Sequence, residues 1–364
     1  MNEVVKSCSP LVQLTNHQLT EIMKFVSKYT VAALFAITTL GAHAQSSVNL
    51  FGLLDLSIGS NKAPGGSSQT GIDSGKMTTS YFGMRGSEDL GGGLSAVFRL
   101  EGFLLADTGA SGRFPGDTLF SRTASVGLSS KSFGTFTLGR NTTPLFISTI
   151  SFNPFGDSYG YSPSTRHFFT SGTVTGDSAW NNSALYSSPD FGGFKFGLIG
   201  ATAATKSSGV GSTNGSNWGA NVGYAAGPLS AALVYQSAKK DETRPLLAAA
   251  APAVQADTRT WQLNGAYDFN VVKAFAQYGE VKNTTFTNTY RISELGARVP
   301  VGAGAVLAAW GRVAPKTGAD RNTVSLGYDY NLSKRTDVYA VAMRDKLENI
   351  SAGRSYSVGI RHRF

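Results

Sequence analysis

The segment VNLFGLLDLSIG, Val48–Gly59, decides the fold because apolar residues alternate with polar ones along it. Successive side chains of a β-strand point to opposite faces, so every second position shares a face. Asn49, Asp55 and Ser57 fall on one face. The opposite face carries Val48, Leu50, Leu54, Leu56 and Ile58. Such a strand can turn its apolar face to lipid and point Asp55 into water, which makes Asp55 a candidate residue of an aqueous lumen.

The same alternation recurs along the rest of the chain. In Leu94–Leu105, Arg99 and Glu101 lie opposite the apolar face, and a preceding segment places Arg85 opposite Phe82 and Met84. After residue 46 there is no apolar run of about 18 residues, the length that would predict a membrane helix. Because a soluble β-sandwich also alternates, the pattern by itself leaves that class open.

The connections between these segments discriminate between the two classes. Short connections recur at every second junction: Glu88–Gly93, Ser130–Gly134, Pro189–Gly193, Ala226–Pro228, the region around Asn270, Pro300–Gly304 and Asn331–Lys334. Longer ones fall between them: Ser60–Lys76, Ala106–Asp117, Thr142–Asn182, Thr205–Ser216, Lys239–Asp257, Lys282–Asn288, Pro315–Asp320 and Lys346–Ala352. Seven short and eight long connections require sixteen strands, with both termini on the short-turn side. The sequence therefore predicts an all-β fold, a 16-stranded antiparallel transmembrane β-barrel.

Thr142–Asn182 is the longest of these connections, and it has no convincing strand pattern. A loop of this length in a compact domain is usually functional. It carries Asp157, Arg166 and His167 among aromatic and turn residues. We therefore expect this third long loop to fold into the lumen and to set what passes, with Asp157 and Arg166 as its charged candidates.

The N-terminal region has the parts of a secretory signal. Met23–Ala44 begins with two lysines, continues with an apolar run and ends in the small-residue sequence Ala-His-Ala before Gln45. Its apolar run is shorter than the roughly 20 residues that cross a bilayer as a helix. Because residues 1–22 precede the signal, we interpret them as an extension from a translation start assigned too early. The mature barrel is then expected to cover residues 45–364.

Cysteine content and charge limit the chemistry. The single cysteine, Cys8, precedes the predicted cleavage site, so the mature chain offers no thiol nucleophile and no thiolate metal ligand. We expect no cofactor and no bound metal. The formal net charge is +9, but the basic residues are scattered and no recognition motif appears, which argues against a nucleic-acid partner. In a pore, the same charge would attract anions.

Five segments, taken in order, resemble the general porins of Gram-negative outer membranes, most closely their beta-proteobacterial branch. They are SSVNLFGLLDLSIG (46–59), YFGMRGSEDLGGGLSAVFRLE (81–101), SRTASVGLSSKSFGTFTLGRN (121–141), NSALYSSPDFGGFKFG (182–197) and SVGIRHRF (357–364). The resemblance implies a water-filled barrel in the outer membrane, in contact with its lipids, usually a homotrimer and narrowed by the third long loop. It also implies passive diffusion of small hydrophilic solutes and anions. A C-terminal aromatic residue, here Phe364, would be read by the barrel-assembly machinery.

The resemblance also implies basic wall residues that face acidic residues of the loop. Arg85 and Arg99 have inward parity, whereas Arg122 and Arg140 occur in segments similar to the family but share parity with apolar neighbours. Arg122 and Arg140 would face the lumen only if a bulge intervened or if they lay at a strand end. We take the four arginines as wall candidates and Asp157 as their acidic partner. A solvated residue without a role in selection is the competing interpretation of each.

Two other functions compete with the porin. An outer-membrane lipase or protease needs a nucleophile beside a base, and the sequence has no GxSxG, HExxH or paired Cys/His pattern. Of the histidines, only His167 and His362 fall in the predicted mature chain. The other competitor is a structural or adhesive barrel with an occluded lumen. Conductance across a bilayer would separate these possibilities.

Overall fold

The computed structural model describes residues 47–175, 177–202, 217–239 and 256–364. The predicted signal, 23–44, and the extension, 1–22, lie outside the described residues. Most of two long connections, 205–216 and 239–257, also lies outside them. No helix in the described part of the chain is long and apolar enough to cross a membrane.

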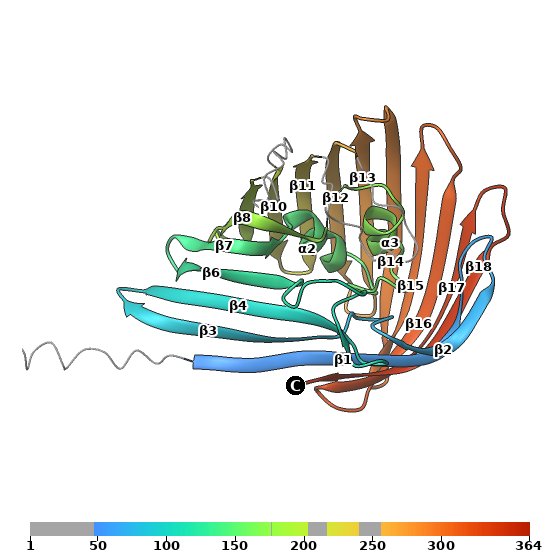
Figure 1. Ribbon diagram of the computed structural model, residues 1–364, viewed down its shortest axis with the longest axis horizontal. Helices are drawn as coiled ribbons and strands as arrows, with labels where there is room; N and C mark the ends of the chain where they lie inside the picture. The colour runs from blue at the N-terminus through green and yellow to red at the C-terminus, as the bar shows by residue number, and fades with distance from the viewer. Residues whose placement is uncertain (1–46, 176, 203–216, 240–255) are drawn as a thin grey trace, which may run out of the picture. The chain divides into compact units, whose positions relative to one another are not determined.

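The described residues form one antiparallel sheet of eighteen strands that closes on itself (Figure 1). Sixteen of these strands build the barrel: β1 Ser47–Lys62, β3 Tyr81–Gly91, β4 Leu94–Leu105, β6 Thr123–Ser130, β7 Gly134–Thr142, β8 Ala179–Ser187, β9 Phe194–Ala201, β10 Asn217–Ala226, β11 Leu229–Ala238, β12 Thr258–Asp268, β13 Lys273–Asn283, β14 Asn288–Val301, β15 Gly304–Pro315, β16 Arg321–Asn331, β17 Thr336–Leu347 and β18 Gly353–Arg363. The other two, β2 Ser68–Ser74 and β5 Ala110–Ser111, lie within long connections. The predicted 16-stranded antiparallel barrel is confirmed.

The barrel closes where its first and last strands meet. Leu53 in β1 lies opposite Arg363 in β18, and the Phe364 N–H donates to the Gly52 carbonyl oxygen at 3.1 Å. Closure leaves no sheet edge with unpaired backbone groups in the hydrocarbon, where each such group would be costly. Ser47 pairs with Ser87 beside the short β3–β4 connection, and His362 pairs with Thr336 beside the short β16–β17 connection, so both described ends lie on the short-turn side, as predicted.

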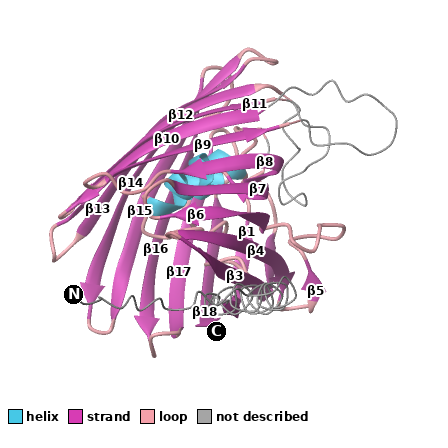
Figure 2. Ribbon diagram, turned by 90° about the vertical axis from the view of Figure 1, so that its left-hand side faces the viewer, coloured by secondary structure: helices cyan, strands magenta, loops and turns pink. Residues whose placement is uncertain are grey.

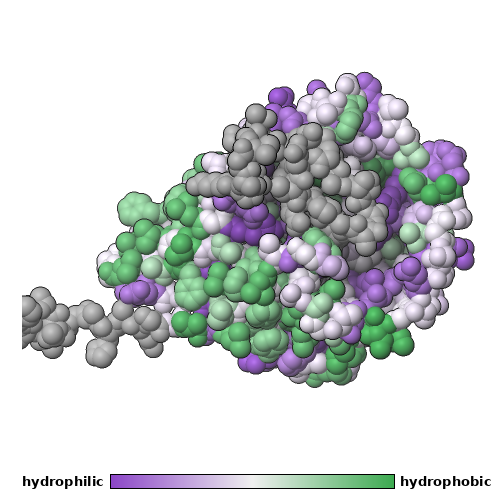
Figure 3. All heavy atoms as spheres, viewed as in Figure 1, coloured by the Kyte–Doolittle hydropathy of each residue, from purple (hydrophilic) through white to green (hydrophobic). Residues whose placement is uncertain are grey.

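The two faces of the wall follow the sequence alternation. On β1, Val48 and Leu50 are each 67% exposed on the outer face, whereas Asp55 and Ser57 point inward and are buried. On β18, Val358 and Ile360 face outward and Arg361 inward. Hydrophobic side chains gather on the outer surface over the region of β1, β3, β4 and β6 (Figure 3). An apolar exterior around polar inward residues is what a barrel in lipid requires.

The third long loop lies inside the ring of strands, where its helices are drawn in cyan (Figure 2). β7 ends at Thr142 and β8 begins at Ala179, so the loop is shorter than the predicted 142–182. Helix α2 spans Pro144–Ser151 and helix α3 spans Pro163–Phe169. In each helix, a hydroxyl residue caps the first turn and proline follows it: Thr143 Oγ1 accepts from Phe146 N–H, and Ser162 Oγ accepts from Thr165 N–H. Proline tolerates the first helical turn because the N–H it lacks would have no partner in the helix there.

Candidate functional site

The inner loop is held against one side of the lumen by buried polar contacts. α2 packs on β9–β12, and α3 packs on β14–β16. Gln277 Nε2 donates to the carbonyl oxygens of Thr149 and Phe152 at 3.0 and 2.9 Å, at the end of α2. The Ser164 N–H at the start of α3 donates to Glu294 Oε2. Because a buried polar group without a partner is costly, these contacts fix the depth of the loop in the barrel.

Three glycines in the wall let the loop approach closely. A Cβ atom at Gly296 would lie 2.5 Å from Pro154 Cδ, and one at Gly311 would lie 2.6 Å from Pro163 Cβ. At Gly279, a Cβ atom would lie 2.9 Å from Cζ of Phe168. A side chain at Gly296 or Gly311 would push the loop toward the opposite wall.

Contrary to the prediction, the Arg166 side chain does not present a free charge to the open lumen. Its Nη2 donates to Asp345 Oδ2 on β17 at 2.9 Å. Asp345 also binds Arg321 on β16, whose Nε lies 2.8 Å from Asp345 Oδ1. Arg166 thus belongs to the contacts between α3 and the wall, and a wall carboxylate compensates its charge.

An open space lies between α2 and the wall formed by β1, β3, β4, β6 and β7. This space, here called the arginine cavity, has a volume of about 540 Å³. Its charged lining residues are Arg85, Arg99, Glu101 and Arg122. The loop contributes apolar side chains, among them Ile147 and Ile150.

Arg85 and Arg99 lie directly opposite each other on β3 and β4. Both guanidinium groups lie over the ring of Phe51, with Cζ atoms 4.8 and 5.6 Å from the ring centroid. Arg99 also forms an ion pair with Glu101, whose side chain is buried. Like charges directly opposite each other destabilise a sheet, so the Arg85–Arg99 pair lowers the stability of the folded barrel. The same pair gives this part of the wall a positive potential.

Arg122 points inward although its sequence parity predicts the outer face. It immediately precedes β6, so strand alternation does not govern its direction. Its N–H donates to the Glu101 carbonyl oxygen at 3.2 Å, and its Nε lies 3.4 Å from Glu101 Oε2. Its Cζ lies 4.2 Å from the centroid of the Tyr81 ring. The strand-end alternative is therefore the one that the structure adopts.

Asp157 on the inner loop is a second acidic group, besides Glu101, that interacts with Arg122. Its carboxyl group also interacts with Arg361 and with the hydroxyl group of Thr78. Burial raises the pKa of Asp157 above its usual range, because the loss of water outweighs the attraction of the two arginines.

Arg140 does not occupy the predicted wall position, because it does not line the arginine cavity. β7 has an irregular register at Gly139, where φ is +129°. Beyond this bulge, Arg140 Nη2 donates to Asp177 Oδ2 at 2.7 Å, and Nε donates to the Ser121 carbonyl oxygen at 2.6 Å. Arg113 binds the same carboxylate through two hydrogen bonds of 2.9 Å. Burial alone would raise the pKa of Asp177, but Arg113 and Arg140 hold it well below its usual range.

Asp55 is buried rather than free in the lumen. Its Oδ2 accepts from the N–H groups of Met77 and Thr78, both at 2.7 Å. Its Oδ1 accepts from the Tyr339 hydroxyl at 2.6 Å. Asp55 therefore positions the segment that leads into β3, and that segment supplies the Thr78 hydroxyl beside Asp157.

Comparisons with known proteins agree with this geometry. A model of the Gram-negative porin family matches residues 30–349. The chain belongs to this family. An outer membrane porin protein of Bordetella pertussis is 32% identical, over 92% of this chain and 98% of that protein. This porin is therefore a multi-pass β-barrel protein of the Gram-negative outer membrane.

Solved structures place this porin among the same barrels. An anion-selective porin from Comamonas acidovorans superposes with a TM-score of 0.73 and 28% identity, covering 88% of this chain and 100% of that one. OmpT of Vibrio cholerae, an outer membrane protein described in a trimer form, has a TM-score of 0.64 and 15% identity, covering 88% and 99%. The second likeness supports the fold alone.

Sequence reasoning missed several charged residues of this porin. Arg361 has inward parity in the closing segment, yet its partners Asp337 and Asp329 on β17 and β16 could not be assigned from sequence. Arg113 and Asp177 lie in two different long connections and carried no local signal. Only the alternation around Arg361 could have identified it as a lumen residue.

Proposed function

We propose that this porin conducts small hydrophilic solutes and ions passively and prefers anions mildly. The observation that carries the proposal is the opposed pair Arg85 and Arg99. The cavity lining has one carboxylate, Glu101, which pairs with Arg99 and Arg122, whereas Arg85 forms no ion pair among the described residues. The facing side of α2 supplies Ile147 and Ile150 rather than acids. Charged residues that line a pore select ions by sign, so an excess of arginine favours anions. The similar Comamonas porin is itself described as anion-selective.

The competing functions fit the geometry less well. An occluded adhesive barrel does not account for an open cavity of about 540 Å³ beside the inner loop. His167, the candidate base for an enzyme, is buried, and its Nε2 shares a hydrogen bond of 2.9 Å with Thr323 Oγ1. Burial lowers the pKa of His167 to about 3, so the ring stays neutral and is shielded from solutes. Passive diffusion needs no catalytic group.

The same proposal extends to assembly and partners. We expect a homotrimer surrounded by outer-membrane lipids, since the general porins that the sequence resembles assemble in this way. Phe364, which is 43% exposed at the end of the closing strand, is the expected signal for the barrel-assembly machinery. Its backbone forms hydrogen bonds with Gly52, so Phe364 is the last residue that joins the closing strand to β1.

Recordings of the purified protein in a planar bilayer test the proposed function. We expect stepwise conductance in KCl and, across a KCl gradient, a reversal potential whose sign reports chloride preference. A protein that inserts but never conducts would contradict the channel. A reversal potential that favours potassium would contradict the anion preference alone.

The preference should depend on pH through Asp157. Because its pKa is raised, Asp157 takes up a proton at a higher pH than an ordinary aspartate does. Protonation removes a negative charge beside Arg122, so the ratio of chloride to potassium permeability should rise as the pH falls through that pKa. Asp157→Asn should show the higher ratio already at neutral pH and lose this pH step. A step of the same size in the variant would assign the titration to another group.

A further inference from the structure

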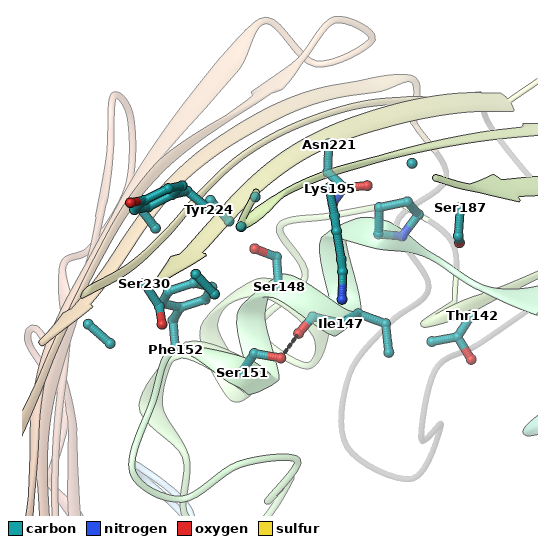
Figure 4. A pocket seen from close by; sticks show the side chains of 18 of the residues that line it. Thr142, Ile147, Ser148, Ser151, Phe152, Ser187, Lys195, Asn221, Tyr224 and Ser230 are labelled. Atoms are coloured by element: carbon teal, nitrogen blue, oxygen red, sulfur yellow. Dashed lines mark hydrogen bonds between the residues drawn. The ribbon is translucent and has the colours of Figure 1, made fainter. Parts of the chain in front are cut away.

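Helix α2 also borders a second space, here called the lysine recess, which adjoins the arginine cavity: both are lined by Thr142, Ile147, Leu185 and Ser187. It has a volume of about 390 Å³ and lies against β8–β13, toward their short turns. Figure 4 shows the side chain of Lys195 reaching from β9 toward α2, where Ser148 and Ser151 lie. The other charged residue of the lining is Lys273, at the start of β13. No lining residue of the recess is acidic.

The lysines of the recess are poorly neutralised by the protein. Lys195 Nζ lies 3.5 Å from Asp190 Oδ2, but both side chains are more than half exposed, and such surface pairs contribute little. Lys273 forms no ion pair within the described part of the chain. Asp268 lies directly opposite Lys273 but forms no ion pair with it; the Asp268 carboxylate accepts the Asn270 N–H at 2.9 Å.

A third cation stands beside Lys273. Arg298 on β14 lies directly opposite Lys273, and its place in the alternation, two residues from Gly296, turns it toward the lumen. Among the described residues, Arg298 likewise has no ion pair. Directly opposed like charges destabilise a sheet, and a bound anion would relieve their repulsion.

Apolar side chains line the same recess. Phe152, Ala232 and Ala266 pack together with Phe275 in one buried cluster. The first three of these residues line the recess, and Lys273 Nζ lies 5.5 Å from the centroid of the Phe275 ring. A solute here would meet positive charge and apolar surface together, whereas the arginine cavity adds a carboxylate, Glu101.

We propose that the lysine recess binds monoanions with an apolar body, such as aromatic or branched aliphatic carboxylates. Their carboxylate is attracted by the positive charges of Lys195 and Lys273, which line the recess from β9 and β13, and their apolar part covers Phe152, Ala232 and Ala266. Small anions without an apolar part, such as chloride or acetate, receive only the electrostatic attraction and pass without being held. The proposal rests on the proposed function, because solutes reach the recess through the lumen.

Benzoate and acetate, added to channels recorded in KCl, separate the two contributions to binding. We expect benzoate to interrupt the current at a concentration at least tenfold lower than acetate does. The double variant Lys195→Gln/Lys273→Gln should raise the benzoate concentration for half-block about tenfold and move the acetate value much less. The matched control, Lys131→Gln/Lys334→Gln, removes two exposed lysines from short turns on the same side of the barrel and should keep the wild-type benzoate value.

Equal block by benzoate and acetate, or full benzoate block in the Lys195/Lys273 variant, would overturn the site. Saturation-transfer NMR of benzoate with the detergent-solubilised protein reads the same site without conduction. Benzoate binding that requires Lys195 and Lys273 supports the recess even if the protein fails to conduct in KCl, a failure that would count against the proposed function only. If the protein conducts but benzoate shows no saturation transfer from it, the proposed binding site is wrong and the proposed channel function is unaffected.

Discussion

Replacing Arg85 and Arg99 together with glutamine is expected to lower the ratio of chloride to potassium permeability about fivefold or more. Unit charges about 4 Å apart in water interact by roughly 1 kcal/mol, which corresponds to about a fivefold change in the local concentration of an ion. The double variant leaves Arg122 and Glu101 as the charged lining of the arginine cavity, with Asp157 beside Arg122. Their sum no longer favours anions, so the preference should vanish or reverse.

The matched control for that variant is Arg344→Gln/Arg354→Gln. These two arginines also lie directly opposite each other, but on the exposed outer face of β17 and β18. The control removes the same net charge and should keep the wild-type reversal potential in a KCl gradient. Arg122→Gln should have a smaller effect than the double variant, because Glu101 and Asp157 already offset Arg122. An unchanged permeability ratio in the Arg85/Arg99 variant would show that selection arises elsewhere.

The barrel was predictable from sequence because lipid contact imposes a period of two on every strand. Arg85, Arg99 and Glu101 could be placed in the lumen for this reason, since each lies well inside a regular strand. Alternation did not predict the direction of side chains at strand ends and bulges. Arg122 stands one residue before β6, and Arg140 follows the bulge at Gly139, so neither direction could be read from parity.

The inner loop was predictable in position but not in structure or attachment. Its two helices did have a local signal, a capping hydroxyl residue followed by proline, in Thr143-Pro144 and Ser162-Pro163. The contacts that hold the loop against the wall had no local sequence signal. Gln277 and Glu294 lie more than a hundred residues from the loop atoms they bind, and Asp345 joins Arg166 to Arg321 across three elements. Such pairings depend on the closed barrel and cannot be assigned before it.

The glycines behind the loop lead to the second large prediction, a lower single-channel conductance in Gly311→Leu. Even a Cβ atom at this position would lie 2.6 Å from Pro163 Cβ and 3.1 Å from His167 Cε1. The wall strand β15 is fixed by pairing with β14 and β16 on both sides, so α3 must give way. It can move only toward the lumen, which narrows the path beside the arginine cavity. Overpacking of this kind also costs about 1–3 kcal/mol of stability.

Gly265→Leu is the control for this substitution. Its Cβ atom would meet nothing within 4 Å, and Gly265 lies in β12 between the inward residues Asn264 and Ala266, so its side chain would face outward. The control should conduct like the wild type in the same KCl recordings. Gly296→Leu, where the Cβ atom would lie 2.5 Å from Pro154 Cδ, should repeat the reduction from the segment between α2 and α3. A rise in conductance in either lumen variant would mean that the loop leaves the barrel when it is displaced. The contacts of Gln277 and Glu294 would then be too weak to keep it at the constriction.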